Sequence, residues 1–219
     1  GGTLMTNADR KLIAALLDRS GSMRAIAADM CGGFDAFIAK ERAQPGSTLV
    51  TLAQFNDRYE VVYENQPIGA VPDLRLEPRG NTALFDAIGR FITEVGAGLA
   101  ALPEDDRPGG VTVLVITDGH ENSSREWTAE AVRQLIAQQE KQYSWDFVFL
   151  GANMDAVDVG TGLGFAADKS LTYDADGDGV RGAWNAVSSY TDRKRHRGDA
   201  PAGSVGFDDA ERSAARKRR

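Results

Sequence analysis

The sequence has 219 residues, enough for one domain with a sizeable core and short for two. With 42% hydrophobic and 26% charged residues, its composition is ordinary for a globular protein, and no apolar run is long enough to span a membrane. The net charge is −7, but residues 191–219 carry nine Lys or Arg and five Asp or Glu, which leaves −11 on the remainder. Such an acidic body argues against a nucleic-acid-binding surface on the main domain.

Apolar runs and helical patterns alternate along the chain. Strands are predicted over residues 12–17, 48–55, 59–64, 111–117, 147–150 and 170–173. Helices are predicted over residues 23–44, 84–99, 128–143 and 180–190, with a short helical piece from Met154. The link 56–58 is so short that the second and third strands must form a hairpin. The pattern therefore predicts an α/β fold, a doubly wound, mostly parallel six-stranded sheet with one antiparallel strand at an edge.

The domain boundaries follow from where this alternation starts and stops. Residues 10–192 are interpreted as one domain, and residues 1–9 as an N-terminal extension. After about Thr191 the apolar period ends, so residues 193–219 are predicted to be a basic, weakly ordered tail. The single cysteine, Cys31, excludes an internal disulfide, and the N-terminus has no signal pattern. We therefore expect a cytoplasmic protein, with no membrane segment.

Three loops carry oxygen-bearing side chains at element boundaries. They are Asp18-x-Ser20-x-Ser22 after the first strand, Gly80-Asn81-Thr82 before the 84–99 helix, and Thr117-Asp118-Gly119 after the 111–117 strand. In a doubly wound sheet, ligands bind outside the carboxyl ends of the strands, so the first and third loops are expected on the same rim. Gly21, between the two serines, is expected to let its loop fold tightly.

Together these loops offer two carboxylates and three hydroxyls as metal ligands: Asp18, Ser20, Ser22, Thr82 and Asp118. These hard oxygen donors suit Mg²⁺, Mn²⁺ or Ca²⁺ and not zinc or copper. Five side chains, some acting through water, would leave at least one coordination position open. A carboxylate from a partner protein is the natural ligand for that position.

This pattern resembles a von Willebrand factor A (vWA) domain with a metal-ion-dependent adhesion site (MIDAS). That family has Asp-x-Ser-x-Ser after the first strand, Thr after a Gly-rich turn, and Asp after the fourth strand. Element order is similar over residues 10–190, and the sequence looks closest to intracellular bacterial and phage-type members, including those similar to tellurite-resistance vWA proteins. The resemblance implies a non-enzymatic module that binds an acidic side chain of a partner protein. It suggests a MoxR-type AAA+ ATPase, or a component of a bacterial stress-response or phage-defence assembly.

Other interpretations of the three loops remain open. Asp18 and Ser22 could simply cap the first helix, since Asp and Ser are common in turns and caps. A Mg²⁺-dependent phosphohydrolase would use Asp18 as its nucleophile, but it would want a second carboxylate close by and a Lys or Arg to neutralise phosphate. No lysine occurs in any of the three loops. A structural vWA domain with an inert site is the third alternative.

Several other polar residues have simpler interpretations. The run Asp174–Gly179 imitates the start of a calcium-binding loop, but its twelfth position is Asn185 where that loop needs Glu, so an acidic turn capping the last helix is favoured. His120 and Glu121 are expected near the rim of the metal site. Arg19 is expected to be exposed, although it could meet an incoming carboxylate. Two further expectations are turn positions for Asn56 and Asp57, and core positions for Trp127, Trp145 and Trp184.

Overall fold

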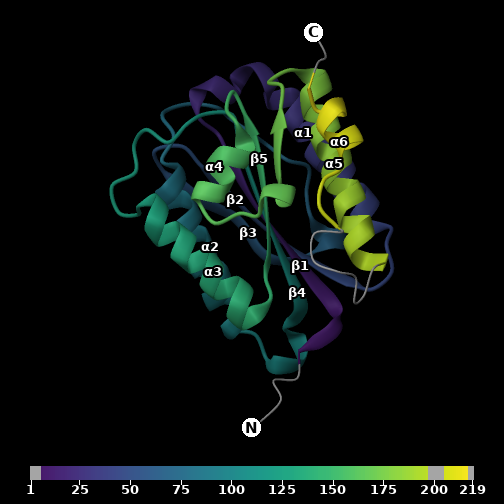
Figure 1. Cartoon of the computed structure of the whole chain (residues 1–219). Helices are drawn as coiled ribbons and strands as arrows, with labels where there is room; N and C mark the ends of the chain where they lie inside the picture. The colour runs from purple at the N-terminus through teal and green to yellow at the C-terminus, as the bar shows by residue number, and fades with distance from the viewer. Residues whose placement is uncertain (1–5, 197–204, 217–219) are drawn as a thin grey trace.

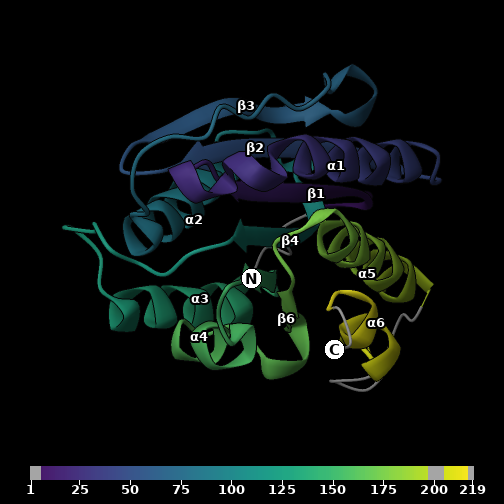
Figure 2. The ribbon, with the colours of Figure 1, turned by 90° about the horizontal axis from the view of Figure 1, so that it is seen from above.

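A computed structural model describes residues 6–196 and 205–216. A six-stranded sheet in the order β3-β2-β1-β4-β5-β6 forms its centre (Figures 1 and 2). The parallel strands are β1 (Asn7–Asp18), β2 (Ser47–Phe55), β4 (Pro108–Thr117), β5 (Asp146–Ala152) and β6 (Ser170–Tyr173). The edge strand β3 (Tyr59–Pro67) runs antiparallel to β2. The predicted fold class is thus confirmed, including the antiparallel edge strand.

Helices cover both faces of the sheet (Figure 1). On one face lie α1 (Ala27–Arg42) and α5 (Gly177–His196), and on the other lie α2 (Leu84–Ala100), α3 (Ala129–Tyr143) and α4 (Ala156–Gly162). Successive residues of β1 enter opposite cores, so that Ile13 faces α1 and Leu12 faces α2. Because both faces are buried, this strand reads in the sequence as a continuous apolar run.

The domain begins earlier than expected. β1 starts at Asn7, whose backbone N–H donates to Arg107 O at 2.8 Å, so the boundary expected at residue 10 is three residues late. The first residues of β1 are polar and partly exposed, and they therefore leave no apolar signal. The predicted 23–44 helix likewise starts as a short 3₁₀ helix, Gly21–Ile26, before α1.

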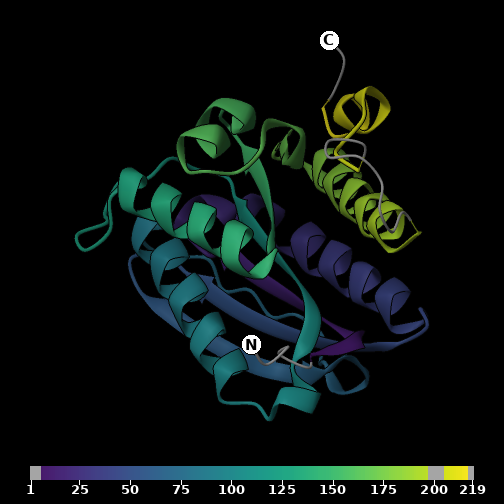
Figure 3. The same cartoon turned by 60° about the horizontal axis from the view of Figure 1, so that its bottom comes forward.

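The expectation of a weakly ordered tail from residue 193 is wrong for the part of it that the structure describes. α5 continues to His196, and α6 (Asp209–Ala214) packs beside α5 (Figure 3). Phe207 is buried in the core, and Arg193 pairs with Glu211 at 2.8 Å. Isolated anchors of this kind have no periodicity for a sequence pattern to reveal. Residues 197–204 and 217–219 of the expected tail, and residues 1–5, lie outside the described residues.

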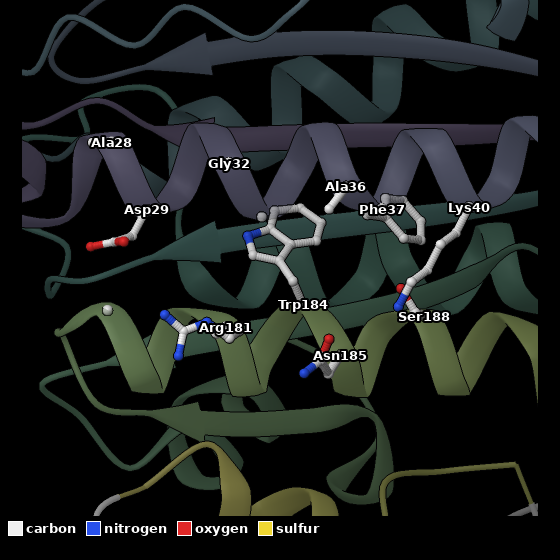
Figure 4. A pocket seen from close by; sticks show the side chains of 12 residues that line it. Ala28, Asp29, Gly32, Ala36, Phe37, Lys40, Arg181, Trp184, Asn185 and Ser188 are labelled. Carbon is white, nitrogen blue, oxygen red and sulfur yellow. The ribbon is translucent and has the colours of Figure 1, made fainter.

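Trp184 joins the two helices on one face of the sheet. Its indole reaches from α5 toward α1 (Figure 4) and packs on Phe34 and Phe37. The close approach depends on Gly33, since a Cβ at that position would lie 2.1 Å from Trp184 Cδ1. Trp184 and Trp145 are buried as expected, whereas Trp127 is only partly buried, against Gly89.

Gly33→Ala should destabilise the protein by about 1–3 kcal/mol, because the added methyl group forces the indole of Trp184 out of its position. Gly32→Ala is the matched control. It lies in the same helix, and a Cβ there meets nothing within 4 Å, so this variant should gain roughly 0.5–1 kcal/mol from helix propensity. Urea unfolding of both variants measures the difference. Equal changes in the two would show that the contact with Trp184 is not what requires a glycine.

Candidate metal centre

The three predicted loops meet at the carboxyl end of the sheet. β1 and β4 are parallel neighbours, with Leu17 paired to Ile116, so Asp18 and Asp118 leave the sheet side by side. Of the five predicted ligands, Ser22 is exposed and four are buried: Asp18, Ser20, Thr82 and Asp118. The site therefore has a buried floor and one side chain at the protein surface.

Hydrogen bonds connect four of the five residues, three of them through their side chains and Asp18 through the backbone N–H of Ser20. Ser22 Oγ donates to Asp118 Oδ1 at 2.7 Å, and the hydroxyls of Ser20 and Ser22 lie 3.2 Å apart. Asp18 Oδ1 accepts from the backbone N–H of Ser20 at 2.6 Å. The other oxygen of Asp18 accepts from Thr117 Oγ1, also at 2.6 Å. Simple helix capping does not explain this arrangement, because no side chain caps the 3₁₀ helix that begins at Gly21.

Thr82 approaches the same group from a third loop. A Cβ on Gly119 would lie 3.8 Å from Thr82 Oγ1 and 4.0 Å from Ser22 Oγ, so both hydroxyls border Gly119. Asn122 holds Thr82 in place through a reciprocal pair: Thr82 N donates to Asn122 Oδ1 and Asn122 N donates to Thr82 O, each at 2.9 Å. The structure thus brings all five predicted residues together.

The turn before Thr82 depends on Gly80 and also on Asn56, which the sequence indicated only as a turn residue between two strands. Asn56 is buried, and its Nδ2 donates to Arg79 O at 2.8 Å, while its backbone oxygen accepts from Ala83 N. Gly80 has φ of +77°, and a Cβ there would lie 2.3 Å from Asp57 Oδ1. A side chain at Gly21 would meet only Gly80 O, at an ordinary 3.7 Å. The tight turn therefore requires Gly80, and the role expected for Gly21 is wrong.

Glu121 and His120 differ in their roles. Glu121 Oε1 accepts from Phe85 N at 3.2 Å, and its Oε2 accepts from Ser123 N and Ser124 N. This carboxylate caps α2 and its own loop, so it supports the fold and does not face the candidate ligands. His120 is exposed.

Farther along the chain, Asp176 Oδ1 accepts from Gly179 N at 2.8 Å, as expected of a turn that caps α5.

Burial raises the pKa of both carboxyl groups at this site. For Asp18, desolvation outweighs the hydrogen bonds from Ser20 and Thr117 that favour the charged form. For Asp118, desolvation and the nearby charge of Asp18 outweigh the hydrogen bond from Ser22. Two carboxylates held together in a buried position favour a cation between them, because a cation would offset both the desolvation and the repulsion.

Hydroxyl groups are an essential part of this donor set. Within residues 6–196 and 205–216, no three or more His, Cys, Asp and Glu side chains are grouped so that they could hold a metal. The five oxygen-bearing side chains fit a hard divalent cation, with neutral hydroxyls filling the positions that carboxylates leave.

None of the described helices combines the length and apolarity needed to cross a membrane.

The chain has the fold of a von Willebrand factor A domain. Similar solved structures include the mussel byssus proximal thread matrix protein 1 with a zinc-occupied MIDAS motif (18% identity, TM-score 0.57, covering 84% of this chain and 46% of that one). Another is the ArnB paralog VWA2 from Sulfolobus acidocaldarius, with 16% identity and a TM-score of 0.53, covering 84% of this chain and 46% of that one. A third is a von Willebrand factor type A protein from Catenulispora acidiphila, with 15% identity and a TM-score of 0.54, covering 85% of this chain and 43% of that one. The chain thus spans less than half the length of these structures, and no family model or curated protein sequence matches it.

Proposed function

We propose that the protein is a divalent-cation-dependent protein-binding module. Asp18, Ser20, Ser22, Thr82 and Asp118 hold the cation, which is Mg²⁺ or alternatively Mn²⁺ or Ca²⁺. A Glu or Asp side chain of a partner protein completes its coordination at the exposed side of the site. The observation that carries this proposal is the geometry of the donor set: two buried carboxylates, of which Asp18 accepts from the Ser20 backbone and Asp118 from the hydroxyl of the exposed Ser22, while the two serine hydroxyls lie 3.2 Å apart.

The charge balance of the donor set supports a partner carboxylate. Only two of the five ligands are charged, and the other three are neutral hydroxyls that donate little electron density, so an open position on the cation is electrophilic and suits a further anionic oxygen. The similar mussel structure carries zinc in its MIDAS motif, which supports a divalent metal in this fold and makes zinc a necessary comparison. From the family resemblance, a MoxR-type AAA+ ATPase or a bacterial stress-response component is the partner class that we propose to test first.

Binding is favoured over phosphohydrolase chemistry by the contacts of Asp18. Both of its carboxylate oxygens accept short hydrogen bonds from within the protein, which holds them in place as metal ligands and lowers their availability as a nucleophile. We therefore propose that the site does not hydrolyse phosphate esters. A screen of phosphatase substrates with and without Mg²⁺ tests this, and turnover that Asp18→Ala abolishes would establish the enzymatic alternative.

Calorimetric titration with Mg²⁺, Mn²⁺, Ca²⁺ and Zn²⁺ tests the metal site. Wild-type protein should bind one divalent cation, and Asp118→Ala should lose that binding. The matched control is Asp178→Ala, which removes an exposed aspartate that pairs with Arg181 and belongs to none of the three loops, and it should leave the titration unchanged. No binding by the wild type, or equal binding by Asp118→Ala, would overturn the proposed metal site.

Partner binding is tested separately by affinity capture from the native host. A partner that uses the metal should be lost both on chelation with EDTA and in the Asp118→Ala variant. Capture that survives both treatments would contradict recognition through the cation.

A further inference from the structure

A small basic cavity lies at the end of the sheet opposite the candidate metal centre. Its volume is about 190 Å³, and it lies between the amino-terminal halves of β1 and β4 and the last turns of α5. Lys11, which lines it, and Asp18 are seven residues apart in β1, and a strand rises ~3.3 Å per residue, so roughly 23 Å separates the two sites. The cavity is therefore distinct from the metal-binding surface.

The charged side chains of the lining are all cationic. Among the described residues that line the cavity are Lys11 of β1 and Lys194 and Arg195 of α5, and none of them carries a carboxylate. The three cationic side chains are 31%, 39% and 16% exposed, respectively, so a small ligand can reach them. On a chain with a net charge of −7, this lining is a strong local excess of positive charge.

Glu41, which lies outside the lining, offsets two of these cations with a single charge. Its Oε2 lies 2.8 Å from Lys11 Nζ and 2.6 Å from Arg195 Nη2. Arg195 also pairs with Asp192 at 2.9 Å, but that carboxylate is 56% exposed, so solvent weakens its effect. One buried negative charge is thus shared between two cations.

Asp146 is shared in the same way. Its Oδ2 lies 2.9 Å from Lys194 Nζ, and its Oδ1 lies 2.7 Å from Lys169 Nζ. Glu140, the other carboxylate that acts on Lys169, is exposed. Burial lowers the pKa of Lys194, and the charges of Lys169 and Lys11 lower it further, although Asp146 opposes them. The cations of this group therefore repel one another, and an anion in the cavity would relieve that repulsion.

Hydrogen-bond donors remain available at the same place. Within the described part of the chain, Lys11 Nζ makes one hydrogen bond and the guanidinium of Arg195 makes two, all of them to carboxylates. Since an ammonium has three N–H donors and a guanidinium five, most of these donors can serve a ligand. Thr112 adds a hydroxyl to the lining, and because its Oγ1 accepts from Lys194 Nζ at 3.4 Å, its own proton is left to donate.

We propose that this cavity binds a phosphate group, either as free phosphate or as part of a monoester. Such a group carries a charge of about −1.5 to −2 and at least three acceptor oxygens, so it can contact three separate cations and a hydroxyl at once. A carboxylate has one charge and two oxygens. The cavity is smaller than the roughly 300–1,000 Å³ of pockets for drug-sized ligands, so it holds the phosphate group itself and not an attached ring. The proposal goes beyond the proposed function and does not depend on it.

A phosphorus NMR titration with inorganic phosphate tests the site on protein freed of divalent cations by a chelating resin, so that no phosphate binds through a metal. Wild type should bind saturably, and Lys194→Met should weaken binding about tenfold or more through loss of a charge-assisted hydrogen bond. Asp146 keeps Lys169 as its partner in this variant. Thr112→Val, which removes only a hydroxyl from the lining, should weaken binding several-fold. Lys141→Met is the matched control, because it removes an exposed lysine of α3 on the other face of the sheet and should have no effect.

Parallel titrations with phosphoserine and acetate identify the ligand. Phosphoserine that binds more tightly than phosphate would indicate a monoester, and the reverse order would indicate free phosphate. Acetate should bind at least tenfold more weakly than either. No saturable binding of phosphate or phosphoserine by the wild type would overturn the proposal, and so would acetate binding of equal strength.

The variants decide whether the binding occurs in this cavity. Phosphate affinity that Lys194→Met and Thr112→Val leave unchanged, or that Lys141→Met lowers equally, would place the binding elsewhere and overturn the proposal. Thr112→Val keeps the test decisive if Lys194→Met does not fold. Asp118→Ala should bind phosphate as the wild type does, and calorimetry should show unchanged Mg²⁺ affinity for Lys194→Met. Failure of the phosphate site therefore leaves the metal-dependent function untouched, and the reverse also holds.

Discussion

Asp18→Asn should abolish divalent-cation binding and at the same time stabilise the metal-free protein. The variant removes a charged ligand from the centre of the donor set, so the stabilisation of the wild type by excess Mg²⁺ should disappear. That stabilisation amounts to about 2.7 kcal/mol at a cation concentration of 100 times the Kd. Without metal, the variant no longer buries a carboxylate against Asp118, which should gain on the order of 1–2 kcal/mol.

The local hydrogen bonds allow this substitution without rearrangement. The amide oxygen of an asparagine at this position can still accept from Ser20 N, and its NH₂ group can donate to Thr117 Oγ1. The Thr117 hydroxyl can then turn its proton toward Gly119 O, which lies 3.1 Å away. The loop should therefore keep its shape while losing its charge.

The pH dependence of stability gives a second readout of the same effect. Because burial raises the pKa of Asp18 in the folded state, the folded protein binds a proton more tightly than the unfolded chain does. Metal-free wild type should therefore lose stability as the pH rises from about 4, the unfolded value, through the raised pKa. Asp18→Asn should show a weaker decline, since Asp118 still contributes.

Thermal unfolding from pH 4 to 8, with and without Mg²⁺, measures these effects. Asp178→Asn serves as the control, because its exposed carboxylate lies outside the site. A variant that is less stable than metal-free wild type, or that Mg²⁺ still stabilises, would show that Asp18 has a structural role and not the role of a metal ligand.

The sequence was sufficient to predict the architecture and to predict that the candidate ligand residues lie together. Two apolar runs, each ending in or followed by an aspartate, implied parallel strands whose carboxyl ends share one rim, and the structure makes these strands neighbours, with Asp18 at the end of β1 and Asp118 directly after β4. Periodicity gives such information because the burial of each element follows from its own residues.

The residues that support the site could not be found in this way. Asn56 and Asn122 act through bonds to the backbone of Arg79 and Thr82, respectively, which are distant in sequence. In a single sequence each resembles an ordinary turn residue. Likewise, Arg19 is buried, contrary to the sequence-based expectation, and its partners are distant in sequence: its Nη1 pairs with Glu60 of β3 and its backbone oxygen accepts from Arg79 N. No local pattern encodes those contacts.

Glu41→Gln should lower stability by about 3 kcal/mol, or roughly 10 °C in Tm. Glu41 is almost fully buried at the end of α1, where the helix dipole disfavours a negative charge that lacks partners. Its carboxylate accepts from Lys11 at 2.8 Å, Arg195 at 2.6 Å and Thr191 at 2.6 Å, which joins β1, α1 and α5. An amide would turn its own N–H groups toward these donors, leaving the cations without a counter-charge.

The pH dependence should identify the ionic origin of this loss. Burial alone would raise the pKa of Glu41, but the hydrogen bonds and charges of Lys11, Thr191 and Arg195 outweigh it and lower the pKa. The contribution of Glu41 is therefore complete above the unfolded value of about 4.3 and is lost as the pH falls through the lowered folded value. The stability difference between wild type and Glu41→Gln should accordingly shrink in acid.

Urea unfolding between pH 3 and 7 tests the Glu41 prediction, with Glu130→Gln as the matched control. Glu130 also lies on a helix and pairs with an arginine, at 2.5 Å to Arg133, but it is exposed, so water replaces the lost contact and little stability should be lost. Equal losses in the two variants would show that burial does not determine the contribution of Glu41. A loss at Glu41 alone would show that its buried contacts stabilise the fold, and one of them reaches Arg195, beyond residue 192, where the apolar pattern of the sequence had already ended.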